Sequence, residues 1–152
     1  MVLGMAMLPT ACRSRSTYEG KSVAALGRML HDADPKVQAQ GAYGLSLVGP
    51  EARPALPALT ELLKSPDTLV RQNAAMALGH IGPEAADAVP ALTETLQDKE
   101  WTVRRQATMA LGQIGPPALA AVPSLQKLTA DQDKWVRKEA REALSKIKSQ
   151  KR

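Results

Sequence analysis

Residues 67–82 read DTLVRQNAAMALGHIG, and residues 100–115 repeat the same pattern as EWTVRRQATMALGQIG. The apolar residues of the first stretch follow one another at steps of three and four: Val70, Ala74, Ala77, Leu78 and Ile81. This spacing predicts a helix with one buried face. Gly82 and Pro83 come directly afterwards, and this pair is a strong helix stop.

The pattern recurs along most of the chain with a period of 33 residues. Four positions carry it: Val37, Val70, Val103 and Val136; Leu26, Leu59, Leu92 and Leu125; Leu45, Leu78, Leu111 and Leu144; and Val48, Ile81, Ile114 and Ile147. A helix pair cannot bury its apolar face alone, so such units stack. We therefore predict an all-α fold, an α-solenoid of four stacked helix-turn-helix repeats. The repeats span about 22–50, 54–83, 87–116 and 120–148.

Each unit contains a first helix before the second helix described above. Pro57, Pro90 and Pro123 lie early in the first helices, where a missing amide costs little. An acidic residue then precedes each second helix. Aspartate is a good N-cap and is found in three units, whereas Glu100 in the third unit is a poorer cap.

These residues resemble the HEAT-like repeats named after phycobilisome lyases. The resemblance rests on residues 67–82 and 100–115 and extends over about residues 22–148. It implies a solenoid whose specificity resides in variable positions of the second helices. Lyases, hydroxylases, adaptors and scaffolds all contain such repeats, so fold alone does not assign function. An arginine recurs in the last three repeats but is Gln38 in the first, so a ladder of Asp–Arg contacts is expected to be incomplete there.

The composition argues against most kinds of catalytic or metal centre. The 152 residues include one cysteine and two histidines, which excludes an intramolecular disulfide framework and a four-ligand zinc site. Hydroxylases built on similar repeats hold two irons with several His-Glu pairs, and this chain has none. Serine-hydrolase, P-loop and HExxH motifs are also missing from the sequence. We expect a non-enzymatic protein without cofactor or metal.

We expect the partner-binding surface on the concave face that the second helices form. In helix 68–81 the residues opposite the buried set are Gln72, Asn73, Met76 and His80, and a shift of 33 gives the others. The candidate residues are Gln40, Tyr43, Leu47, Gln72, Asn73, Met76, His80, Arg105, Gln106, Met109 and Gln113.

Tyr43, Met76 and Met109 form an apolar row beside the amides of this surface. Such a row suits an adaptable contact with a protein or peptide partner. The alternative is that the two methionines pack between neighbouring helices. For Trp101 and Trp135, at the start of their helices, we expect packing against the neighbouring repeat; exposure would instead make them anchors for a partner.

The net charge of +5 is concentrated near the C-terminus. Residues 134–152 carry eight basic and two acidic side chains, and residues 22–133 carry nine basic and twelve acidic ones. We interpret residues 149–152 as a basic tail and this end of the solenoid as a solvated cap. The alternative functions are binding to nucleic acid or to an anionic surface through this terminus, or service as an accessory subunit of a lyase or another enzyme.

Residues 1–20 do not continue the repeat and are interpreted as a leader. The apolar segment that ends at Cys12 resembles the end of a bacterial lipoprotein signal, which would make Cys12 a lipidation site. No basic residue precedes the apolar segment, and Pro9 is unusual in such a signal. Two locations stay open: the cytoplasm with a disordered leader, and the cell envelope with a lipid anchor or after export.

Overall fold

The computed structural model describes residues 17–149 and contains four consecutive helix pairs. The pairs are α1 (Val23–Met29) with α2 (Pro35–Val48), α3 (Leu56–Leu62) with α4 (Thr68–Ile81), α5 (Val89–Thr95) with α6 (Trp101–Ile114), and α7 (Val122–Leu128) with α8 (Lys134–Ser149). The 3-10 helices η1 (Gly49–Ala55), η2 (Gly82–Ala88) and η3 (Pro116–Ala121) connect them. The predicted all-α solenoid of four repeats is confirmed.

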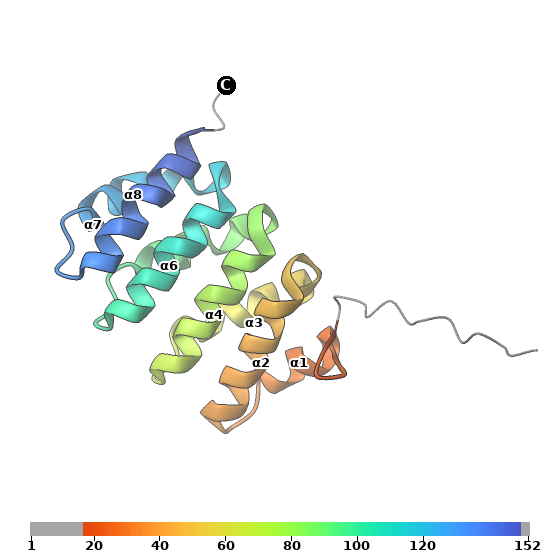
Figure 1. Cartoon of the computed structure of the whole chain (residues 1–152). Helices are drawn as coiled ribbons and strands as arrows, with labels where there is room; N and C mark the ends of the chain where they lie inside the picture. The colour runs from red at the N-terminus through yellow and green to blue at the C-terminus, as the bar shows by residue number, and fades with distance from the viewer. Residues whose placement is uncertain (1–16, 150–152) are drawn as a thin grey trace, which may run out of the picture.

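The helices form two layers (Figure 1). The second helices α2, α4, α6 and α8 lie side by side in chain order, and each packs against the first helix of its own pair. The first helices and the 3-10 helices form the other layer. The N-terminal hairpin and α8 therefore lie at opposite ends of the stack.

The helix boundaries follow from residues that satisfy the free backbone groups at helix ends. The side chains of Asp34, Asp67 and Asp133 each accept a hydrogen bond from an amide in the first turn of the following helix. Glu100 begins α6 without such a bond, as its longer side chain predicts. The helices α2, α4 and α6 end at glycines with positive φ, which other residues rarely adopt.

The core is built from the periodic aliphatic residues and from alanines. Leu59, Leu92 and Leu125 of the first helices are fully buried. Burial of each such leucine side chain contributes about 2 kcal/mol to folding. Val37 and Leu144, which lie in the first and last repeats, are only half-buried because a neighbouring repeat is missing on one side. The two layers thus share one continuous core.

Small residues allow neighbouring second helices to approach closely. A Cβ atom added to Gly79 would collide with the side chain of Gln113 and lie 2.8 Å from Cα of Ala110 on α6. One added to Gly112 would lie 3.0 Å from Cα of Ala143 on α8. These contacts fix the spacing of the second helices along the stack.

Arginine–aspartate pairs join consecutive repeats. Arg71 donates from Nε and Nη2 to the two carboxylate oxygens of Asp98, at 2.7 and 3.1 Å. Arg104 binds Asp131 in the same way, at 2.9 Å for both bonds. Burial opposes ionisation of both aspartates, but the arginine hydrogen bonds and a backbone amide outweigh it, so the pKa of each lies below its ordinary value.

The first repeat lacks this pair, as predicted. Gln38 stands in place of the arginine and donates only to the backbone oxygen of Asp32, at 2.8 Å. Ser65 occupies the position in the second repeat that corresponds to Asp98 in the third and Asp131 in the fourth. Both members of the pair are therefore changed together, and no buried carboxylate is left without a cation.

A β-hairpin covers the N-terminal end of the stack. Its strands β1 (Thr17–Tyr18) and β2 (Lys21–Ser22) pair antiparallel around Glu19 and Gly20, which both have positive φ, as in the tight two-residue turns of hairpins. Tyr18 packs over Gly44, where a Cβ atom would lie 2.7 Å from the tyrosine ring. Residues 17–20, assigned to the leader from sequence, are thus docked onto the first repeat.

Candidate partner-binding face

The solvent-facing sides of the four second helices form one continuous surface, which we call the second-helix face. Each helix contributes one stripe, with residues about one turn apart. The stripes are Lys36, Gln40, Tyr43 and Leu47 on α2; Leu69, Gln72, Met76 and His80 on α4; Thr102, Arg105, Gln106, Met109 and Gln113 on α6; and Trp135, Lys138, Glu139, Glu142 and Lys146 on α8.

The predicted site residues differ in how far they reach solvent. The exposed ones are Gln40, Tyr43, Leu47, His80 and Gln113, and the half-buried ones are Gln72, Met76, Arg105, Gln106 and Met109. Asn73 is buried, with 8% of its surface exposed. The exposed part of the predicted site therefore combines the apolar side chains of Tyr43 and Leu47 with the amides of Gln40 and Gln113.

Asn73 and His80 hold α4 against α2. The Asn73 side chain donates from Nδ2 to the backbone oxygen of Ala39 at 2.9 Å. His80 Nδ1 lies 2.7 Å from the backbone oxygen of Ser46, and because a carbonyl only accepts, this nitrogen carries the proton. Both side chains thus position the face, and the Asn73 amide is already engaged within the fold.

Arg105 makes the corresponding connection between α6 and α8. Its Nε and Nη2 donate to Oε1 of Glu139 at 3.2 and 2.9 Å. The arginine side chain keeps 37% of its surface exposed, whereas Glu139 keeps only 12%. The guanidinium is therefore fixed in orientation while part of it still faces solvent.

A groove opens between α6 and α8 on this face. It has a volume of about 210 Å³ and is lined by Met109, Gly112, Gln113, Glu139, Glu142, Ala143 and Lys146. Its apolar lining comes from Met109, Gly112 and Ala143, and its polar lining comes from the longer side chains. Met109 is half-buried here, so it packs between the helices and also reaches the surface.

Three exposed residues near the start of the second helices extend the candidate site beyond the predicted set. Leu69 is 54% exposed and Trp135 is 43% exposed, and both belong to the stripes given above. Trp101 is 41% exposed at the start of α6, so neither tryptophan is buried by a neighbouring repeat. The sequence indicates both tryptophans as anchors if they are exposed, and extending the predicted stripes by one turn would also have found Leu69.

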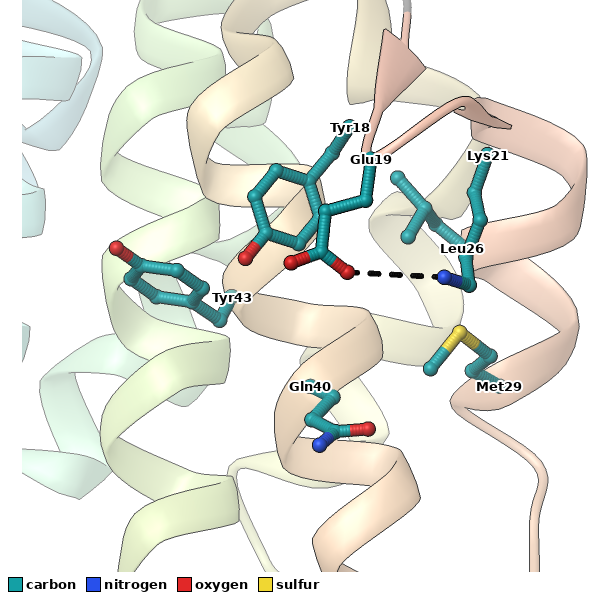
Figure 2. A pocket seen from close by; sticks show the side chains of 7 residues that line it. All are labelled: Tyr18, Glu19, Lys21, Leu26, Met29, Gln40 and Tyr43. Carbon is teal, nitrogen blue, oxygen red and sulfur yellow. Dashed lines mark ion pairs between the residues drawn. The ribbon is translucent and has the colours of Figure 1, made fainter.

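A small pocket lies where the hairpin meets the N-terminal end of the face (Figure 2). Its volume is about 100 Å³, and its lining includes Tyr18, Glu19, Lys21, Met29 and Tyr43. The two tyrosine rings meet edge to face, with centroids 5.8 Å apart. Desolvation and the neighbouring Glu19 carboxylate raise the pKa of Tyr18.

Other predicted features give no site in the part of the chain that the structure describes. Cys12 and most of the expected leader lie outside residues 17–149. No group of three or more potential ligands among the described residues could hold a metal ion. Within the same range, no helix combines the length and the apolar character needed to cross a membrane.

Known proteins share both the sequence pattern and the fold. The family model of HEAT repeats matches residues 23–100 and 89–152. No curated protein matches the sequence. A solved engineered protein is 33% identical, with a TM-score of 0.72 over 84% of this chain and 62% of its own.

Two natural proteins also have similar structures. The complex of CpcE and CpcF of phycocyanin lyase from Nostoc sp. PCC7120 matches at 26% identity and a TM-score of 0.72, over 84% of this chain and 53% of that one. Human deoxyhypusine hydroxylase matches at 29% identity and a TM-score of 0.66, over 87% and 45%. The present chain spans less than two thirds of the length of each of these three structures.

Proposed function

This chain belongs to the HEAT-repeat family, and from that premise we propose that it is a non-enzymatic scaffold or adaptor whose second-helix face binds a protein or peptide segment. The proposal takes the face as a rigid platform. Its side chains are positioned before binding, so little conformational entropy is lost when a partner docks.

The observation that carries the proposal is the distribution of exposed apolar side chains. Among the described residues, six large hydrophobic side chains are exposed. Four of them belong to the second-helix face: Tyr43, Leu47, Leu69 and Trp135. A fifth, Trp101, lies at the start of α6, and Leu119 lies in η3. Apolar surface gathered on one side of a molecule marks interaction sites.

The interhelical contacts supply the rigidity that this function needs. Asn73 and His80 bond to backbone oxygens of α2, and Arg105 bonds to Glu139 of α8. Each bond joins a residue on or directly beneath the face to a neighbouring helix. The half-buried Met76 and Met109 add apolar side chains that can adapt to a partner.

Assembly with another protein chain is consistent with the comparisons. The matched lyase structure is a complex of two chains, CpcE and CpcF. This supports a protein partner in general terms and leaves open service as an accessory subunit of an enzyme. The charges on the face do not form a phosphate track, because Glu139 and Glu142 lie among the basic residues of α8.

The test is a pull-down from lysate of the source organism, read by quantitative mass spectrometry. The baits are the wild type and the triple variant Tyr43→Glu, Met76→Glu and Met109→Glu. Glu142 occupies the equivalent, exposed position on α8, and circular dichroism checks that the triple variant is folded. We expect a protein that the wild type captures and the folded variant loses.

A matched control adds the same charge to other parts of the surface. Gln97→Glu, Leu119→Glu and Gln126→Glu replace exposed residues outside the second-helix face. This variant should capture the partner like the wild type. Equal capture by all three folded proteins would refute the proposed face. Capture that depends steeply on salt and on residues 146–152 would instead support the alternative through the basic terminus.

A further inference from the structure

Two tryptophans and an ion pair lie in the first two turns of α6 and α8, at the edge of the second-helix face. Trp101 lies one helical turn before Arg105 on α6, and Trp135 lies one turn before Glu139 on α8. Arg105 and Glu139 bind each other across the two helices. The Trp–Arg block, as we call these four residues, therefore spans adjacent helices with an indole at the start of each.

Two cationic side chains, Arg105 and Lys134, lie near the indole ring of Trp135. The guanidinium carbon of Arg105 lies 5.9 Å from the centre of the Trp135 ring, and Lys134 Nζ lies 5.1 Å from it. No carboxylate of residues 17–149 forms an ion pair with Lys134. The neighbouring carboxylates are already engaged. Glu139 binds Arg105, Glu142 lies 3.7 Å from Lys138, and Asp133 accepts hydrogen bonds from the backbone amides of Trp135 and Val136.

The fold itself does not require tryptophan at these positions. Pro35 and Thr68 occupy the place of Trp101 in the first two repeats, and Lys36 and Leu69 occupy the place of Trp135. Both indoles also remain more than two fifths exposed. Large aromatic side chains that are exposed and held beside a fixed guanidinium are typical anchors at interfaces.

We propose that the Trp–Arg block is the anchor point for an acidic polypeptide segment that carries an apolar side chain between its carboxylates. This inference rests on the proposed function and specifies the chemical character of the partner segment. The apolar side chain covers the exposed indole surfaces. The carboxylates pair with Lys134 and with Nη1 of Arg105, the nitrogen that Glu139 does not use.

Charge complementarity favours this partner over a nucleic acid. The basic groups here are few and are interrupted by Glu139 and Glu142, so successive phosphates would meet carboxylates. A peptide can place one or two carboxylates beside the cations and an apolar group between them. Arg105 is already oriented by Glu139, which reduces the cost of ordering it on binding.

The two tryptophans are the only ones in the chain, so intrinsic fluorescence reports directly on the block. The probe is a capped Ser-Glu-Leu-Glu-Ser peptide, which places one apolar side chain between two carboxylates. Its controls are the same design with lysine for glutamate, the same design with serine for leucine, and an oligothymidylate. We expect the acidic apolar peptide to change the emission at saturation and to bind at least about tenfold more tightly than each control.

Variants of the block then locate the binding. Trp135→Ala should weaken binding of the acidic apolar peptide about tenfold or more, read from the remaining Trp101. The double variant Arg105→Gln and Glu139→Gln removes both charges while keeping side chains that can hydrogen-bond, and it should weaken binding similarly. Lys127→Gln, an exposed residue of α7, is the matched control and should bind like the wild type.

Three results would overturn the inference: no fluorescence response to the acidic apolar peptide, equal affinity for the lysine peptide, or tighter binding of oligothymidylate. The pull-down separates this inference from the proposed function. A partner that Trp135→Ala captures normally and the Tyr43, Met76 and Met109 triple variant loses would refute the block and keep the face. If neither variant changes capture, the proposed function fails as well.

Discussion

At the residue scale, the strongest specific contacts between repeats are the arginine–aspartate pairs. Arg104 uses two nitrogens on Asp131 and a third on the backbone oxygens of Asp98 and Lys99. One side chain therefore closes its own interhelical loop and binds the next repeat. Within residues 17–149 no buried side-chain nitrogen or oxygen is left without a hydrogen-bond partner, so removal of either member of a pair is expected to be costly.

The pair makes stability depend on pH in a predictable direction. Because the pKa of Asp131 is lowered in the folded state, the pair stabilises the fold above the unfolded aspartate pKa of about 4. That contribution is lost as pH falls through the lowered, folded-state pKa. Asp131→Asn should reduce the free energy of unfolding by about 2 kcal/mol at neutral pH and by progressively less in acid. Urea unfolding of both proteins across this pH range measures the difference, and a constant gap would contradict the prediction.

Glycine substitutions distinguish close helix contacts from simple helix propensity. Gly79→Ala should destabilise the fold by about 1–3 kcal/mol, because the new methyl group meets Gln113 and Ala110. Gly27→Ala is the matched control, since nothing lies within 4 Å of the added methyl group and alanine favours the helix. It should raise stability by up to about 1 kcal/mol. Thermal unfolding compares the two, and a neutral Gly79→Ala would contradict the assigned spacing of α4 and α6.

At the scale of elements, α6 is the second helix with the poorest start. Glu100 does not cap it, whereas Asp34, Asp67 and Asp133 cap α2, α4 and α8. Glu100→Asp should therefore stabilise the protein by about 1 kcal/mol. The reverse exchange Asp67→Glu should destabilise it by a similar amount. Chemical unfolding measures both, and a destabilised Glu100→Asp would show that the glutamate is needed at the start of α6.

Most elements could be predicted from sequence, because periodic aliphatic residues, caps and glycine stops are local signals. The hairpin of residues 17–22 could not, because it depends on the distant contact of Tyr18 with Tyr43 and because Glu19 is not a usual residue for positive φ. The burial of Asn73 could not be predicted from the sequence either. Its bond to the backbone of Ala39 depends on how closely two repeats approach, which the sequence pattern does not state.

At the scale of the whole molecule, the two ends of the stack are closed by different structural elements. The hairpin covers the first repeat, whereas the last repeat ends in the charged helix α8. The first repeat also lacks an arginine–aspartate pair to the second. We therefore expect this repeat to open most readily, with the contacts of Tyr18 on Gly44 and Tyr43 opposing its opening.

Tyr18→Ala tests the role of the hairpin. It removes the ring that packs on Gly44 and Tyr43, so amide hydrogen exchange in α1 and α2 should become faster. Exchange in α4 and α6 should change little. Lys127→Ala, an exposed position of α7 outside the hairpin, serves as the control. Unchanged exchange in α1 and α2 of the Tyr18 variant would show that the hairpin does not stabilise the first repeat.

The central claim is that the second-helix face contacts the partner, and methionine methyl spectra test it most directly. Met76 and Met109 lie on this face. Met29 lies on α1 in the first-helix layer and is the reference signal. Addition of the captured partner to protein labelled with ¹³C at the methionine methyl groups should shift or broaden the signals of Met76 and Met109. Unchanged signals from both residues at saturating partner would contradict the claim and place binding elsewhere on the molecule.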